Sequence, residues 1–214
     1  MKLANILAAA LLCGTAVAAN ATTLVDGSFE TKGASTPVTD YCYDGFATPG
    51  GPACAASPWT GNGVIISGSG PWGGTAAANG IYYAFVQGTG VLSQSFTATS
   101  TSGRGVSWLD SNRSNNGGLQ SYTVSISDGM TTTGLGTYTS NVGAFVARTS
   151  SPFLAVSGTT YTLSFTGLSN EDRTSFIDNV ALTAVPEPAT WALLIGGFTM
   201  VGFAARRRRA ALAA

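Results

Sequence analysis

Short stretches of alternating apolar and polar residues recur through the middle of this 214-residue chain. The clearest are residues 120–127 and 161–166, in which Ser and Thr separate the apolar side chains. A period of two places the apolar residues on one face of a β-strand and the polar residues on the other. The pattern therefore predicts half-buried strands with polar outer faces.

Further short apolar segments, bounded by turn residues, complete the predicted set of strands. They are residues 23–30, 64–67, 81–86, 91–97, 105–110, 135–139, 143–148 and 174–184. Turns at residues 87–90 and 128–129 predict hairpins, and residues 32–58 predict a long irregular loop. No segment between residues 19 and 185 predicts a helix, so we expect an all-β sandwich. No fixed-period repeat favours a solenoid, and no regular Thr-x-Thr array predicts an ice-binding face.

The N-terminus has the pattern of a secretory signal peptide. Lys2 precedes an apolar run over residues 3–17, and Ala16-Val17-Ala18 has the small-x-small form of a cleavage site. We therefore predict a signal helix, export through the Sec machinery and removal of residues 1–18. Ala19-Asn20-Ala21 is an alternative cleavage site.

The C-terminal stretch, residues 185–214, has three parts in order. Pro186, Glu187 and Pro188 end the preceding domain, since proline cannot continue a strand. An apolar run begins at Trp191, and its 15 residues give about 22 Å of helix against the roughly 30 Å of a bilayer core. Lengthened to residues 189–205, it predicts a single, marginal transmembrane helix. Four arginines follow and favour a cytoplasmic tail: Arg206, Arg207, Arg208 and Arg209.

These three parts closely resemble the PEP-CTERM sorting signal, which has Pro-Glu-Pro, then usually Trp-Ala, a short span and an Arg-rich end. The resemblance covers residues 185–214. It implies recognition and cleavage by exosortase in a Gram-negative bacterium that makes extracellular polysaccharide. An ordinary C-terminal membrane anchor is the alternative. Both place the preceding domain outside the cytoplasm, and they differ only on processing. The sorting signal implies an inner-membrane-anchored precursor whose domain then reaches the cell surface or the extracellular space.

Charge and cysteine content limit what residues 19–184 can do. This segment has nine acidic and five basic side chains, a net charge of −4, which offers no electrostatic surface for nucleic acid. Cys42 and Cys54 form an even pair in an exported protein and favour a disulfide, with two free thiols as the alternative. The chain has no histidine, so a metal site built on His or Cys is not expected.

Two end segments carry a second resemblance. Asp26-Gly27-Ser28-Phe29-Glu30 and Phe176-Ile177-Asp178-Asn179-Val180-Ala181-Leu182 resemble the first and last strands of galactose-binding-like jelly rolls. Many carbohydrate-binding modules have that fold, so we expect a jelly-roll-like β-sandwich. The resemblance also implies a structural calcium held by Glu30 and Asp178, with the Asp26 and Gly27 carbonyls completing the shell. Alternatively, Asp178 bonds to loop amides or pairs with Arg173.

Period two places Phe176, Asp178, Val180 and Leu182 on one face of the last strand. An apolar face with a carboxylate in it requires a partner for that carboxylate.

Aromatic residues are the candidate ligand contacts. Trp59 and Trp72 lie in Gly/Pro-rich segments, which predicts exposed rings able to stack on a sugar. Rings that fold back onto the sandwich are the alternative, and Trp108 is expected in the core.

Catalytic residues are not expected. A triad that needs histidine is excluded, and nothing in the sequence brings two carboxylates together across a cleft.

The sequence therefore predicts a non-enzymatic, exported β-sandwich protein. The leading hypothesis is a structural or adhesive envelope component associated with extracellular polysaccharide. A carbohydrate-binding module with a defined sugar site is the alternative, and a glycan-active enzyme is the third reading.

Overall fold

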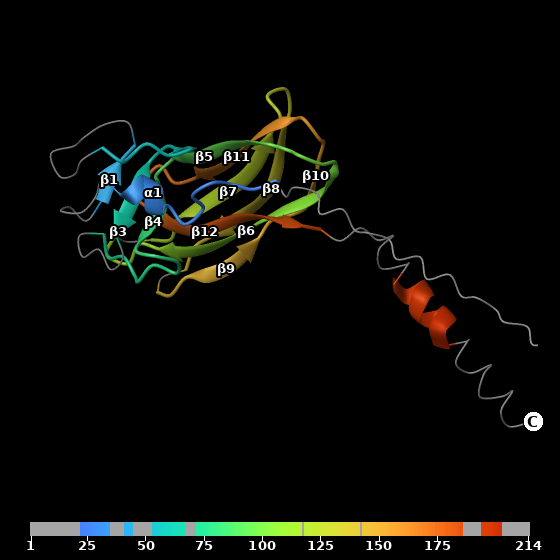
Figure 1. The fold of residues 1–214 in the computed structure, drawn as a ribbon. Helices are drawn as coiled ribbons and strands as arrows, with labels where there is room; N and C mark the ends of the chain where they lie inside the picture. Colours follow the sequence, from blue (N-terminus) through green and yellow to red (C-terminus); the bar gives the residue numbers. More distant parts are fainter. Residues whose placement is uncertain are drawn as a thin grey trace, which may run out of the picture.

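The structure, a computed structural model, describes residues 22–34, 41–44, 53–66, 72–116, 118–141, 143–185 and 194–202. The predicted signal peptide, Asp40, the Pro-Glu-Pro motif, Trp191 and the four C-terminal arginines lie outside these residues. Two antiparallel sheets pack face to face and form a β-sandwich (Figure 1). The predicted all-β sandwich is confirmed.

The larger sheet has seven strands, in the order β1-β3-β4-β12-β6-β10, with β9 also paired to β6. The strands are β1 (Tyr41–Tyr43), β3 (Gly63–Ile66), β4 (Tyr82–Gln87), β6 (Ser102–Asn112), β9 (Val146–Thr149), β10 (Phe153–Ala155) and β12 (Thr174–Ala184). The longest pairing joins β12 to β6.

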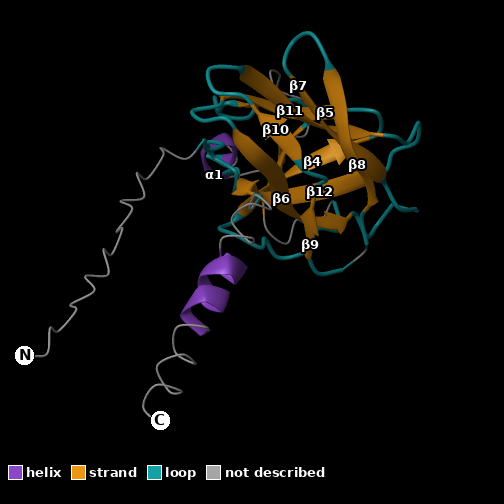
Figure 2. Cartoon of the chain, turned by 90° about the vertical axis from the view of Figure 1, so that its right-hand side faces the viewer, coloured by secondary structure: helices purple, strands orange, loops and turns teal. Residues whose placement is uncertain are grey.

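The smaller sheet has five strands, in the order β2-β5-β11-β7-β8. They are β2 (Trp59–Thr60), β5 (Val91–Thr97), β7 (Ser121–Ser127), β8 (Thr132–Thr139) and β11 (Thr160–Gly167). Viewed from one end, β5, β7 and β11 form the upper layer, and β6, β9 and β12 form the lower layer (Figure 2).

The core lies between the sheets because alternate residues of each strand point inward. Strands β7 and β11 bury every second side chain, as their sequence pattern predicts. The core includes Trp59, Trp108, Tyr122 and Phe165, all almost fully buried.

The predicted strand at residues 23–30 and the predicted absence of a helix are both wrong. Residues 23–29 form turns instead of a strand, and a one-turn helix, α1 (Glu30–Gly33), follows. Asp26 and Phe29 have left-handed backbone conformations, with φ of 55° and 62°, that interrupt any extended segment. The sequence prediction also missed β1, β2 and β10, which are two or three residues long.

The turn at residues 87–90 is present, but it does not form the predicted hairpin. Gly90 N–H donates to the Gln87 carbonyl, so the chain does reverse there. However, β4 pairs with β3 and β12, whereas β5 pairs with β2 and β11. The turn therefore carries the chain from one sheet to the other.

The predicted single face of the last strand is also wrong, because β12 contains a bulge. Its register to β6 shifts between Asp178 and Ala181, where Asn179 has a φ of 51°. An extra residue at a bulge reverses the alternation of side chains. Phe176 thus packs in the aromatic cluster outside the large sheet, whereas Val180 packs in the core between the sheets.

A helix over residues 194–202 follows the sandwich. It covers only part of the predicted transmembrane helix, residues 189–205. Within the part of the chain that the structure describes, no helix has both the length and the apolar character needed to cross a bilayer.

Candidate functional site

Hydroxyl side chains cover the outer face of the five-stranded sheet. These strands point their apolar residues inward, which leaves Ser and Thr at the alternate, outward positions. We call this set the hydroxyl face. It consists of Thr60, Ser93, Ser95, Thr97, Ser121, Thr123, Ser125, Ser127, Thr132, Thr137, Thr139, Thr160, Thr162, Ser164 and Thr166.

Antiparallel register turns these positions into a two-dimensional grid. One row runs across Thr60, Ser93, Ser164 and Ser125. Neighbouring hydroxyls lie about 4.8 Å apart between strands and about 6.7 Å apart along a strand. Several cross-strand pairs are hydrogen-bonded at 2.8–3.1 Å: Ser95 to Thr162, Thr97 to Thr160, Ser121 to Thr139 and Thr60 to Ser93.

The sequence did not predict this grid, although Ser and Thr alternate with other residues in β5, β7 and β11. Short Thr-x-Thr pieces occur, such as residues 160–162, but the regularity of the grid arises between strands. Strand order and register are the information that a single sequence lacks.

The hydroxyl face is uncharged. None of its five strands contains Asp, Glu, Lys or Arg, and its two outward positions without a hydroxyl are Val91 and Gly134. An open hollow of about 510 Å³ lies over β7 and β8, between Thr123, Ser125 and Thr137. Gly134, at the outward position paired with Ser125, lines it and has no side chain to fill it. Such a surface offers hydrogen-bond donors and acceptors to a neutral, polar partner.

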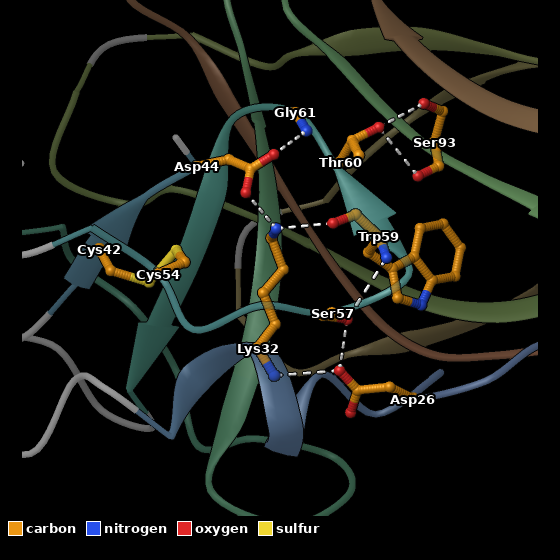
Figure 3. Close-up of polar contacts among 10 residues, drawn as sticks. All are labelled: Asp26, Lys32, Cys42, Asp44, Cys54, Ser57, Trp59, Thr60, Gly61 and Ser93. Carbon is orange, nitrogen blue, oxygen red and sulfur yellow. Dashed lines mark hydrogen bonds and ion pairs between the residues drawn. A yellow bond between two sulfur atoms is a disulfide. The ribbon is translucent and has the colours of Figure 1, made fainter. Parts of the chain in front are cut away.

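A buried lysine supports the edge of this surface (Figure 3). Lys32 is fully buried, and its Nζ donates to Asp44 Oδ1 at 2.6 Å and to the Trp59 carbonyl at 2.7 Å. Gly61 N–H donates to the other Asp44 oxygen at 2.7 Å. The ammonium therefore fixes β2 at Trp59. The next residue of this strand, Thr60, belongs to the hydroxyl face. No pattern in the sequence indicates this role of Lys32.

The structure joins Cys42 and Cys54 in a disulfide beside this network. Cys42 lies in β1, and Cys54 follows the bridge between Ala53 and Tyr43. The disulfide and the Lys32–Asp44 ion pair thus fix the same short segment in two ways.

The two predicted ligand tryptophans are not available for stacking. Trp59 is 1% exposed and packs between Phe29 and Phe165 in the core. Trp72 is 6% exposed and packs against Phe85. The expectation of exposed rings is wrong. Trp59 lies in β2 and points into the core, and Trp72 lies in a turn but packs into an aromatic cluster.

A polar group covers Trp72. The Arg113 guanidinium lies 4.6 Å from the ring centroid and pairs with Asp172 at 3.3 Å. Asn116 donates to the same carboxylate at 2.7 Å, and Gln87 also donates to it. The ring face that a sugar would need is therefore occupied by arginine.

The acids considered for glycoside hydrolysis have separate partners. Asp110 is fully buried and accepts from Tyr122, Ser140 and Arg148 at 2.8–3.1 Å. Burial raises the pKa of Tyr122, as does the nearby Asp110 charge, so this tyrosine stays neutral. Glu171 pairs with Arg173 at 2.6 Å. None of these contacts forms the open carboxylate pair that hydrolysis needs.

Glu30 and Asp178, the predicted calcium ligands, both hold the loop before β4. Glu30 Oε1 accepts from the Ile81 and Tyr82 amides at 2.9 Å. Asp178 Oδ2 accepts from the Ala78 and Asn79 amides at 2.9 Å. Burial raises the pKa of Asp178 to about 6, the Glu30 charge adds to this, and the amides oppose it.

These residues fit a calcium ion poorly. The carbonyls expected to complete the shell are taken, since Asp26 O accepts from Phe29 N–H and Gly27 O from Val180 N–H. Asp178 Oδ1 accepts from the Asn179 amide at 2.7 Å. In the described ranges, no three Asp, Glu, His or Cys side chains converge. The loop amides, one of the two alternatives to calcium, thus stabilise the Asp178 carboxylate.

Comparison with known proteins identifies the end of the chain. Residues 184–209 match the PEP-CTERM protein-sorting motif. The chain therefore has this sorting signal, which belongs to exported proteins that keep a C-terminal membrane-anchoring tail until processing. No curated protein matches the chain.

Solved structures similar to the domain include carbohydrate-binding modules with a jelly-roll fold, adhesin domains and the enzymatically active domain of a bacteriophage tailspike protein. TmCBM61, solved with β-1,4-galactotriose, is 15% identical with a TM-score of 0.49, and the match covers 77% of this chain and 99% of that chain. The xylan-binding CBM22-1 domain of Paenibacillus barcinonensis Xyn10C is 13% identical, with a TM-score of 0.45 and coverage of 66% and 90%. The K1 cleaved adhesin domain of Lys-gingipain from Porphyromonas gingivalis is 13% identical, with a TM-score of 0.44 and coverage of 61% and 93%. At this similarity, ligands do not transfer from these proteins to the chain.

Proposed function

We propose that this protein is a non-enzymatic component of the bacterial cell surface or extracellular matrix that adheres to neutral polysaccharide through its hydroxyl face. The sorting signal supports delivery: exosortase recognises the tail of the exported precursor and releases the domain to the surface. One observation carries the adhesive role. The outer face of the five-stranded sheet presents an ordered, uncharged grid of hydroxyls.

The chemistry of this face matches a neutral glycan. A sugar hydroxyl both donates and accepts hydrogen bonds, and so does each Ser or Thr hydroxyl. Binding buries no protein charge, because the five strands have none, so no charged group loses its hydration. The hollow along Thr123, Ser125 and Thr137 is a shallow depression in which one glycan chain can bind.

The grid favours weak contacts repeated along a polymer over one tight sugar site. Hydrogen bonds exchanged with water contribute only about 0.5–1.5 kcal/mol each. The described hydroxyl face has no aromatic ring for stacking. A long polysaccharide that contacts many such molecules gains avidity through effective concentration. That behaviour suits a matrix adhesive.

A charge placed in the grid tests the proposal. Ser164 lies at its centre, paired in register with Ser93 and Ser125. We expect Ser164→Lys to weaken co-sedimentation with the host's own exopolysaccharide, or with insoluble cellulose, by about tenfold, equivalent to 1.4 kcal/mol. Ala181→Lys, at an exposed position of β12 in the other sheet, is the matched control. Absence of binding to either polysaccharide, or equal losses in both variants, would overturn the proposal.

A further inference from the structure

Both ends of the described domain lie at the same end of the sandwich. Thr22 is hydrogen-bonded to Thr99, and the Val185 amide donates to the Gly103 carbonyl. Thr99 belongs to the connection between β5 and β6, and Gly103 is the second residue of β6. The predicted signal peptide precedes Thr22, and the sorting tail follows Val185. We call this region the tail end: Thr22, residues 99–103, 128–131 and 152–159, and Val185.

The tail end exposes large apolar side chains. Met130 is 96% exposed at the tip of the hairpin between β7 and β8, and Leu154 is 64% exposed on β10. Val156 and Val185 are also exposed. Leu154 pairs in register with Gly103, and Val185 Cβ lies within van der Waals distance of the position that a Gly103 side chain would take. An open hollow of about 420 Å³ separates Leu154 from the hairpin.

Charge is distributed unevenly between the two ends. Among the described residues of the tail end, Asp128 is the one charged side chain, and Arg104, next to the tail end on β6, is buried and donates to Ser100 Oγ at 3.4 Å. Its carboxylate accepts from the Met130 and Thr131 amides, which fixes the hairpin tip and lowers the pKa of Asp128. The opposite end carries Arg113, Asp172 and the Glu171–Arg173 pair.

We propose that the tail end is a membrane-contact surface that rests on the lipid bilayer while the sorting tail is attached. The connection between Val185 and the apolar helix at 194–202 is residues 186–193, which span at most about 28 Å when fully extended. The apolar side chains around the exit therefore face the bilayer into which the tail inserts.

The described tail end exposes no Lys or Arg side chain, since Arg104 is buried, and this identifies the kind of surface it fits. Attraction to anionic headgroups needs basic side chains, at about 1 kcal/mol each. Met130, Leu154 and Val156 instead contribute apolar area, which favours the interface of a neutral bilayer. Strands of the five-stranded sheet run from the tail end to the charged end, so the hydroxyl face stays open during this contact.

Lipid quenching of a fluorescent label tests this contact. The tail-bearing protein is inserted into phosphatidylcholine vesicles that contain a lipid with a quencher at a shallow acyl position. A label on Met130→Cys should be strongly quenched, and a label on Leu119→Cys, exposed near the charged end, should not. Adding Leu154→Ser and Val156→Ser to the Met130→Cys protein should reduce the quenching at least twofold, because the tether is unchanged and only apolar area is lost.

Two outcomes would overturn the proposal. Quenching at Met130→Cys that does not change with the two serine substitutions would show proximity imposed by the tether alone. A Leu154→Cys protein that forms disulfide-linked dimers in vesicles, without lipid quenching, would show that a second copy covers this surface. Neither result depends on polysaccharide binding, so the adhesive function is tested separately.

Discussion

Lys32 and Asp44 form an ion pair at 2.6 Å in which the lysine side chain is almost completely buried and the aspartate is about one quarter exposed. The ammonium donates also to the Trp59 carbonyl, so two of its three protons have partners in the described structure. The pair links the segment after β1 to β2 and so supports the edge of the hydroxyl face.

Removing Asp44 and removing Lys32 should reduce the free energy of unfolding by different amounts. Asp44→Ala leaves a buried ammonium without its counter-charge, and we expect a loss of about 3–5 kcal/mol in the free energy of unfolding. Lys32→Met removes the charge and keeps most of the volume, so its loss should be less than half as large. Urea unfolding at neutral pH, with the disulfide intact, measures both. Equal losses would contradict an unpaired buried charge as the cause.

The disulfide should stabilise the same segment independently. Cys42 and Cys54 are 12 positions apart, and closing a loop of that size contributes about 3 kcal/mol in the chain-entropy model. We expect the double variant, Cys42→Ala with Cys54→Ala, to have a free energy of unfolding lower by about that amount, as measured by urea unfolding. Reduced wild-type protein serves as the control for the alanine substitutions themselves. An unchanged unfolding midpoint in the double variant would count against this role.

Asp178 predicts a pH dependence of stability. Its folded-state pKa of about 6 lies above the ordinary value near 4, so the folded state binds this proton more tightly. The stability that this group contributes is therefore complete below about pH 4 and is lost as the pH rises through 6. When the pH is lowered from 7 to 5, the free energy of unfolding of the wild type should rise by about 1 kcal/mol relative to that of Asp178→Asn.

Urea unfolding of both proteins at the two pH values gives this difference, and other titrating groups cancel in the comparison. The same wild-type advantage at pH 7 and pH 5 would show that burial does not raise the pKa of Asp178.

A chelator distinguishes calcium from loop amides at Glu30 and Asp178. Five amide hydrogen bonds already reach these two carboxylates. We therefore expect the melting temperature to be the same in excess EGTA and in millimolar calcium. A drop of several degrees on chelation, restored by calcium but not by magnesium, would instead support the calcium site that the jelly-roll resemblance implies.

Much of the fold follows from local pattern. Strands β7 and β11 alternate cleanly, so period two alone predicts them and their buried faces. The two-residue strand β2 and the helix α1 have no such pattern, because hydrogen bonds to distant residues define them. Asp26, for example, accepts from the Lys32 amide and from Ser57 Oγ, which fixes the start of α1.

The candidate site was harder to predict than the fold. Gly and Pro around Trp59 and Trp72 indicated exposed loops, but burial of a large aromatic surface outweighs local loop preference. The hydroxyl face depends on which strands become neighbours, since Ser93 and Ser125 are both paired to Ser164 although they are far apart in sequence. Such pairings cannot be deduced from one strand at a time.

The position of β12 determines how the domain responds to pulling. The tail leaves from the end of this strand, and β12 is hydrogen-bonded on both sides, to β4 and to β6. In antiparallel sheets these bonds run perpendicular to the strands. Tension along the tail therefore loads the ladder to β6 in shear first, at residues 181–184, and reaches the ladder to β4, at residues 174–177, through the rest of β12. In shear, the bonds of a ladder share the load instead of opening one by one. If the five-stranded sheet binds the matrix and the tail is anchored in the membrane, the force between them acts along the strands. This is the direction in which the sandwich resists force best.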